Sequence, residues 1–149
     1  MRILLTILFA SAFFEVYGQE IDLVQWQFSG KKINANKYEL HLKATVTKPW
    51  HIYSQHTPPG GPVPTSIMTK SNPLVALDGE AAEVGKLVTR YEATFRVNVQ
   101  YFGDQVDFVQ VVKMKAGIKT TIAGTITYMV CNDKECQPPK EQAFTVQLN

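Results

Sequence analysis

The chain has 149 residues, of which 45% are hydrophobic and 19% are charged, and its formal net charge is +2. This balance is typical of a globular domain that can fill a core, and it excludes the strongly basic composition of a nucleic-acid-binding protein. The lysines are spread along the chain rather than clustered. We therefore expect no nucleic-acid partner.

The first eighteen residues have the organisation of a secretory signal peptide. Arg2 supplies a positive charge, and an apolar run over residues 3–14 leads to a cleavage site before Gln19. The run is too short to span a bilayer, which needs about 20 apolar residues, although an uncleaved anchor is the alternative interpretation. No later segment is long and apolar enough to cross a membrane. We predict residues 1–18 as a signal peptide and residues 19–149 as one exported domain.

Alternation of apolar and polar side chains dominates the rest of the chain, and helical spacing is rare. The clearest alternating segments are residues 38–46, 95–101, 118–128 and 144–148. Each segment is expected to be a strand with one buried and one solvated face. Residues 56–64 are rich in proline and glycine and are expected to form a loop.

Turn-forming dipeptides lie between the alternating segments. They are Ser29-Gly30, Asn72-Pro73, Asp78-Gly79, Gly103-Asp104 and Ala116-Gly117. Seven to nine short strands with such frequent turns predict an all-β fold, an immunoglobulin-like antiparallel β-sandwich. The usual immunoglobulin Cys–Trp–Cys spacing is absent, so we expect the sandwich without its inter-sheet disulfide.

The two cysteines, Cys131 and Cys136, lie near the end of the chain. Exported cysteines usually meet an oxidising compartment and pair. Strands are expected on both sides of the polar residues 132–135, so the cysteines flank a hairpin tip, where a Cα separation of roughly 5.5–6 Å suits a disulfide. A loop this short adds only ~2 kcal/mol of stability. The spacing alone leaves open whether the disulfide is redox-active or structural.

Three motifs follow one another in a fixed order. Residues 48–55 read KPWHIYSQ, residues 60–65 read GGPVPT, and residues 128–139 read YMVCNDKECQPP. Together they resemble the N-terminal periplasmic domain of DsbD, the bacterial thiol:disulfide interchange protein. The likeness covers about residues 26–148. No single motif is diagnostic, but their order and spacing are fairly specific.

The resemblance implies a periplasmic domain that accepts electrons at its cysteine pair and passes them to exported partners, without a cofactor. A thioredoxin-like protein would be its electron donor or acceptor. Cys136 would be the exchange cysteine and Cys131 the resolving one. The active-site neighbours implied by the match are His51, Tyr53, Tyr128 and Pro138. Because His51 and Tyr53 are two apart on a strand, their side chains should share a face.

Family members shield the disulfide with a cap loop that carries an aromatic residue. The best-placed segment here, residues 78–86, has no aromatic residue. Glu83 and Val84 are the cap-loop candidates within it. Shielding of the disulfide is therefore expected to be weaker, or to come from elsewhere.

Two other classes of function compete with thiol–disulfide exchange. One is an exported β-sandwich that binds a partner or ligand and keeps a purely structural disulfide. The other is a metal-handling module, because imidazole and thiolate are zinc and copper ligands. The three histidines, His41, His51 and His56, show no recognised ligand spacing to the cysteines. We therefore expect no metal site, and no hydrolase motif is found.

Overall fold

The computed structural model describes residues 22–115 and 119–149, so the predicted signal peptide and the Ala116-Gly117 turn lie outside the described residues. No helix in the described residues is long and apolar enough to cross a bilayer. The strands are β1 (Val24–Lys32), β2 (Lys37–Val46), β3 (His51–Tyr53), β4 (Ser66–Thr69), β5 (Val75–Leu77), β6 (Ala82–Glu92), β7 (Val97–Met114), β8 (Thr120–Tyr128), β9 (Val130–Cys131) and β10 (Lys140–Leu148).

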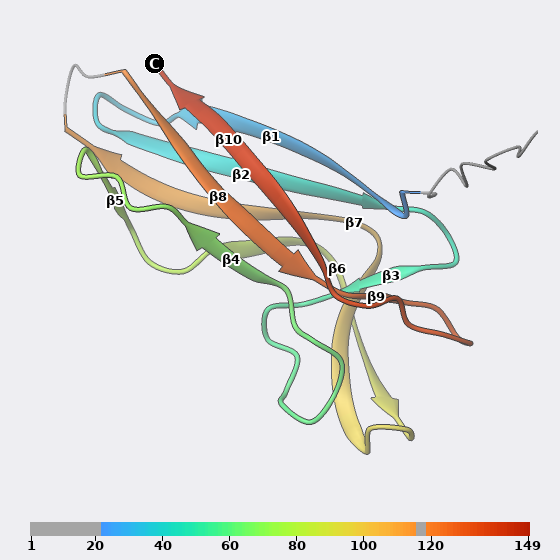
Figure 1. Ribbon diagram of the computed structural model, residues 1–149. Coiled ribbons are helices and arrows are strands. Elements are labelled where there is room, and N and C mark those ends of the chain that lie inside the picture. The colour runs from blue at the N-terminus through green and yellow to red at the C-terminus, as the bar shows by residue number, and fades with distance from the viewer. Residues whose placement is uncertain (1–21, 116–118) are drawn as a thin grey trace, which may run out of the picture.

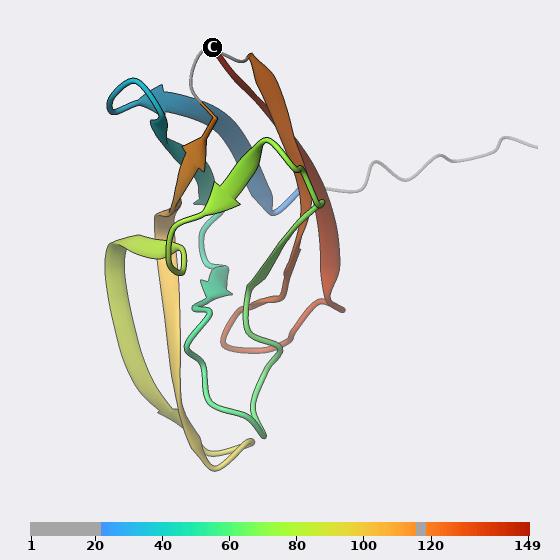
Figure 2. The ribbon, with the colours of Figure 1, turned by 90° about the vertical axis from the view of Figure 1, so that its left-hand side faces the viewer.

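The strands form two antiparallel sheets that face each other (Figures 1 and 2). The larger sheet has seven strands in the order β1-β2-β7-β3-β9, and β5 and β6 also pair with β7. The smaller sheet has the order β10-β8-β4. The predicted antiparallel sandwich is therefore confirmed.

The main core lies between the two sheets and follows from the alternation of the strands. In β2 the inward side chains, from Tyr38 to Val46, are buried at every second position. Ile122 and Ile126 of β8 face them from the smaller sheet, together with Phe144 of β10. Burial of this apolar surface is the main stabilising term of the fold.

Strand β7 is the longest strand and connects the two ends of the larger sheet. Its residues 105–113 pair with β2, whereas residues 101–102 pair with β3. The predicted turn at Gly103-Asp104 is wrong, because both residues lie inside β7. The pairing of β7 with β6 shifts register between Gly85 and Leu87, so the turn-forming residues occupy a β-bulge rather than a chain reversal.

The predicted turn at Ser29-Gly30 is also wrong, because β1 runs straight through it. Gly30 lies where β1 approaches β10 across the sandwich. A Cβ atom there would be 3.0 Å from Leu148 Cδ2 and 3.2 Å from the carbonyl oxygen of Gln147. This glycine therefore permits close packing of two strands rather than a turn.

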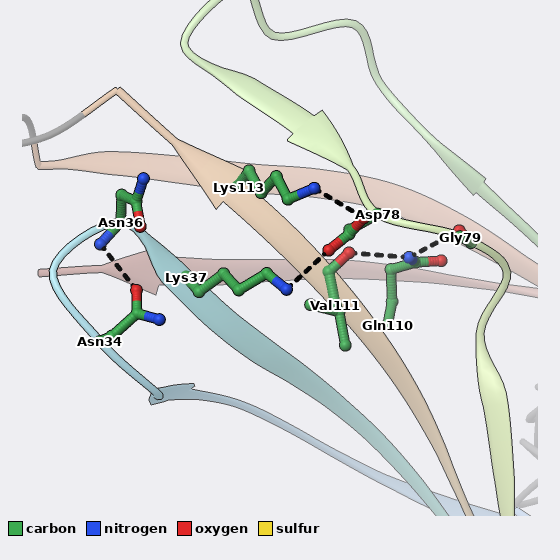
Figure 3. A network of polar contacts seen from close by, with 8 residues as sticks. All are labelled: Asn34, Asn36, Lys37, Asp78, Gly79, Gln110, Val111 and Lys113. Carbon is green, nitrogen blue, oxygen red and sulfur yellow. Dashed lines mark hydrogen bonds and ion pairs between the residues drawn. The ribbon is translucent and has the colours of Figure 1, made fainter.

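A network of polar contacts ties the turn after β5 to β2 and β7 (Figure 3). Asp78 accepts ion pairs from Lys37 and Lys113, each at 2.9 Å. The Gln110 side chain donates to the carbonyl oxygens of Gly79 at 3.0 Å and Val111 at 2.9 Å. The hydrogen bond from Lys113 and then that from Lys37 hold the pKa of the Asp78 carboxyl below its usual value.

A lowered carboxyl pKa in the folded state makes stability depend on pH in a defined direction. Asp78 stabilises the fold above its unfolded pKa, and this contribution is lost as the pH falls through the folded pKa. We expect Asp78→Asn to lower the melting temperature slightly at neutral pH and to match the unsubstituted protein at acidic pH. Asp104→Asn is the control, since the described residues give Asp104 no ion pair. An equal loss at both pH values would contradict the prediction.

Candidate functional site

The cysteine pair closes a small hairpin between the two sheets. After β8, the chain leaves the smaller sheet, and β9 pairs with β3 of the larger one. Cys131 and Cys136 face each other and form a disulfide with a Cα separation of 4.0 Å. The flanking hydrogen bonds, from the Asn132 N–H to Glu135 and from the Gln137 N–H to Val130, are both 2.9 Å. The cysteines are thus a non-hydrogen-bonded pair, the closer type of antiparallel pair.

The tip of this hairpin has its own hydrogen bonds. The Asn132 side-chain oxygen accepts the backbone N–H of Lys134 at 2.8 Å and of Glu135 at 2.9 Å. Such an Asx turn holds a tight chain reversal locally. The shape of the tip therefore does not depend on the disulfide alone.

The two sulfurs lie in different environments. Cys131 is 2% exposed and packs in the disulfide cluster, a small apolar group separate from the main core. Cys136 is exposed. The disulfide cluster consists of Tyr53, Val97, Val99, Tyr101, Met129 and Cys131. The disulfide is therefore more open to an approaching group on its Cys136 side.

Three rings pack beside the disulfide. The His51 ring lies 4.2 Å from the Tyr101 ring, and its Nε2 is 3.2 Å from the Tyr53 hydroxyl. Burial lowers the pKa of His51, with Asp133 opposing the shift. Burial, with a smaller contribution from Glu92, raises the pKa of Tyr53 to about 12. The tyrosine hydroxyl therefore keeps its proton over the whole physiological range.

A shallow pocket of about 230 Å³ brings these groups together. It is lined by both cysteines and the intervening tip, by His51 and Tyr53, and by the turn that joins β6 to β7. That turn contributes Phe95, and Arg90 of β6 forms an ion pair with Asp133 of the tip at 3.0 Å. The pocket thus has one wall made by a hairpin distant in sequence from the cysteines.

Two of the four predicted neighbours of the disulfide line the pocket, and two do not. His51 and Tyr53 share a face, as expected, and both line the pocket with the cysteines. Tyr128 instead belongs to the main core, where its ring contacts Trp26 at 5.4 Å. Pro138 is exposed and does not line the pocket.

The cap-loop candidates lie away from the disulfide pocket. The Glu83 carboxylate accepts hydrogen bonds from the Ser54 hydroxyl and the Gln55 backbone N–H, both at 2.7 Å, and so holds the start of the loop after β3. Val84 is 60% exposed and lines a different hollow, with Lys43 and Asp107 among its neighbours. Neither residue lines the disulfide pocket, because both lie in the first half of β6, whereas the pocket is lined by the end of that strand.

The sequence of the β6–β7 turn contains none of the usual turn residues. The alternation predicts a strand over residues 95–101, but Phe95 lies in the turn before β7. The reversal is closed by the backbone N–H of Arg96, which donates to Glu92 at 2.7 Å. Arg96 has φ 59°, a left-handed conformation usually taken by glycine or asparagine. An aromatic residue, Phe95, therefore lines the pocket, nine residues beyond the end of segment 78–86.

The arrangement places an exposed cysteine, and with it the disulfide, at an open pocket. Within the described parts of the chain, no group of three or more His, Cys, Asp or Glu side chains is placed to hold a metal ion. His41, for example, is 2.7 Å from Asp107, on a strand that makes no part of the pocket. The main feature of the site is an accessible disulfide on a hydrogen-bonded β-hairpin.

The fold and the site define the class of protein: a β-sandwich that carries one accessible disulfide at its end. The family model "Thiol:disulfide interchange protein DsbD, N-terminal" matches residues 22–148. The chain therefore belongs to the DsbD N-terminal domain family. No curated protein sequence matches it.

Two solved structures share the fold at low sequence identity. The reduced N-terminal domain of Neisseria meningitidis DsbD is 15% identical, with a TM-score of 0.52 over 77% of this chain and 86% of that one. The N-terminal periplasmic domain of Proteus mirabilis ScsB is 12% identical, with a TM-score of 0.55 over 89% of this chain and 49% of that one. The chain thus spans about half the ScsB structure. These matches confirm the immunoglobulin-like fold.

Proposed function

We propose that this chain is an exported domain that relays electrons by thiol–disulfide exchange at Cys131 and Cys136. The observation that carries the proposal is the difference between the two sulfurs. Cys136 is exposed at the pocket, whereas Cys131 is buried in the disulfide cluster. Exchange requires that a thiolate reach one sulfur in line with the S–S bond, and Cys136 offers that approach.

The exchange cycle moves two electrons. A donor thiolate attacks Cys136 Sγ, the S–S bond breaks, and Cys131 leaves with the bonding pair as a thiolate. A second thiolate of the donor then attacks its own sulfur in this mixed disulfide. This step releases Cys136 and leaves the donor oxidised. The reduced pair passes its electrons to an exported partner by the reverse sequence.

The proposed location and partners are supported by the likeness to this family. Residues 1–18 are proposed to direct export, and residues 19–149 to act in the periplasm. The structurally similar ScsB domain is described as periplasmic, and thioredoxin-like proteins are the class of partner proposed here. No cofactor is needed, since the cysteines themselves carry the electrons.

A redox titration of the purified domain tests the proposal. We expect the disulfide to open reversibly, while circular dichroism and the melting transition show an intact sandwich. The hydrogen-bonded tip and the separate main core both support this expectation. A purely structural disulfide would instead show a very low potential, or unfolding upon reduction. Either result would refute the proposal.

Phe95 is proposed to shield the disulfide from small thiols. Its ring lines the pocket from the β6–β7 turn. We expect Phe95→Ala to increase the rate of reduction by dithiothreitol several-fold, because access to Cys136 limits that reaction. Tyr91→Ala is the matched control, since Tyr91 is 59% exposed on the same hairpin and does not line the pocket. Equal rates for both variants would contradict a shielding role.

A further inference from the structure

On β3, the residue opposite the buried cysteine is a histidine. In the pairing of β3 with β9, His51 lies directly opposite Cys131. Side chains so placed point to the same face, with Cβ atoms about 4.5–5.5 Å apart. His51 is 8% exposed, and Cys131 is 2% exposed. Both side chains line the same pocket as Cys136.

The two tyrosines fix how the imidazole is presented. Tyr101 packs on the ring, and the Tyr53 hydroxyl is bonded to Nε2. The Tyr53 hydroxyl keeps its proton, and its oxygen can also accept a hydrogen bond. In the tautomer with the ring proton on Nε2, the ring donates to the tyrosine oxygen, and Nδ1 is free to take up a proton. Protonation of Nδ1 leaves the contact with Tyr53 in place. The histidine can therefore change its charge without losing this partner.

Burial makes the ionisation of Cys131 costly. Opening the disulfide at Cys136 leaves a thiolate on Cys131, inside an apolar cluster. An unpaired charge in such surroundings is strongly disfavoured unless a proton or a counter-charge arrives. An adjacent imidazole supplies either, as in other cysteine–histidine pairs.

We propose that His51 is the proton-transfer partner of Cys131 in thiol–disulfide exchange. This proposal rests on the proposed function. In the electron-donating direction, neutral His51 takes the proton of the Cys131 thiol. The Cys131 thiolate then attacks Cys136 Sγ in the mixed disulfide, the Cys131–Cys136 bond forms, and the partner leaves as its thiolate. In the accepting direction, the neutral ring takes the proton of the incoming donor thiol, and the imidazolium so formed gives that proton to the departing Cys131.

The charges around the pocket agree with this role. The charged groups that face it are Arg90 and Glu92 of β6 and Asp133, Lys134 and Glu135 of the tip. They include both signs: Asp133 raises the pKa of His51 and Arg90 lowers it, and burial has a larger effect than either. Because burial lowers the pKa of His51, the ring is neutral, and thus a base, at neutral pH.

The test follows two thiol releases from one reagent. Reduced protein is mixed with the aromatic disulfide DTNB, so that Cys136 forms a mixed disulfide and releases the first coloured thiol. Attack by Cys131 then releases the second, at a rate independent of DTNB concentration. Cys131→Ser should show only the first release, which assigns the second phase.

We expect His51→Gln to slow the second phase by about 10²-fold at neutral pH, the lower end of the range for acid–base catalysis. The deficit should shrink as rising pH ionises Cys131 without help. His51→Tyr keeps a ring in the pocket and should show the same deficit. His56→Gln is the control and should match the unsubstituted protein, because His56 lies in a different hollow.

The outcomes separate the two proposals. If the unsubstituted protein shows both phases and the His51 variants share its pH profile, the role of His51 is refuted, and exchange stands. A uniform slowing at every pH also refutes it, because a structural role predicts that result. If the unsubstituted protein gives no second phase, the proposed function fails, and the inference with it.

Discussion

Replacing Cys131 with serine is expected to leave a protein that reacts once with a thiol partner and then stops. The exposed Cys136 can still form a mixed disulfide, but the sulfur that resolves it is gone. Turnover should be abolished, and a covalent complex should accumulate. Non-reducing gels and intact mass spectrometry of the protein, incubated with an oxidised thioredoxin-like partner after reduction, measure this complex.

Cys136→Ser is the matched variant, and it should trap no complex at comparable rates. Its remaining thiol, on Cys131, is 2% exposed and lies within the disulfide cluster. Turnover is lost in both variants, so the difference in trapping isolates the order of attack. Faster trapping by Cys136→Ser would mean that Cys131 is the exchange cysteine.

A methyl group at Gly124 should have the largest effect on stability. Gly124 lies in β8 between β4 and β10. A Cβ atom there would be 2.4 Å from the Met68 carbonyl oxygen and 2.5 Å from Phe144 Cζ. The backbone oxygen cannot move without breaking the β4–β8 pairing. We expect Gly124→Ala to lower the free energy of unfolding by about 3 kcal/mol, near the top of the usual range for overpacking.

Urea denaturation measures this loss through the midpoint at constant slope. Gly103→Ala is the control, because no atom lies within 4 Å of a Cβ at that position, and β7 holds it in a conformation open to alanine. Its unfolding free energy should change by less than about 1 kcal/mol. A Gly124→Ala variant as stable as Gly103→Ala would contradict the prediction, because it would mean that the strands can move apart without loss of unfolding free energy.

Alternation predicted the sandwich because burial in a two-layer fold repeats every second residue. It succeeded in residues 38–46 and 144–148, where β2 and β10 bury one face. Dipeptide turn signals failed at Gly30 and Gly103. Glycine is also selected by close strand approach and by bulges, and these depend on partners far away in the sequence.

Only those parts of the candidate site that depend on local strand geometry could be predicted from the sequence. The cysteine pair and the shared face of His51 and Tyr53 follow from strand geometry. Phe95 and Arg90 come from a hairpin that meets the disulfide only through tertiary packing. That hairpin could not be predicted from its sequence, because its left-handed position is occupied by Arg96 and none of the usual turn residues occurs at its tip. Sequence spacing could not place the pocket's second wall.

The division into a main core and a disulfide cluster has a consequence for how this domain could be altered. Most of the apolar interior joins the two sheets, while the pocket depends on a handful of side chains around β3 and β9. The residues that contribute most to folding stability are therefore largely different from those that surround the disulfide. Substitutions in the pocket should thus cost less folding stability than substitutions in the main core.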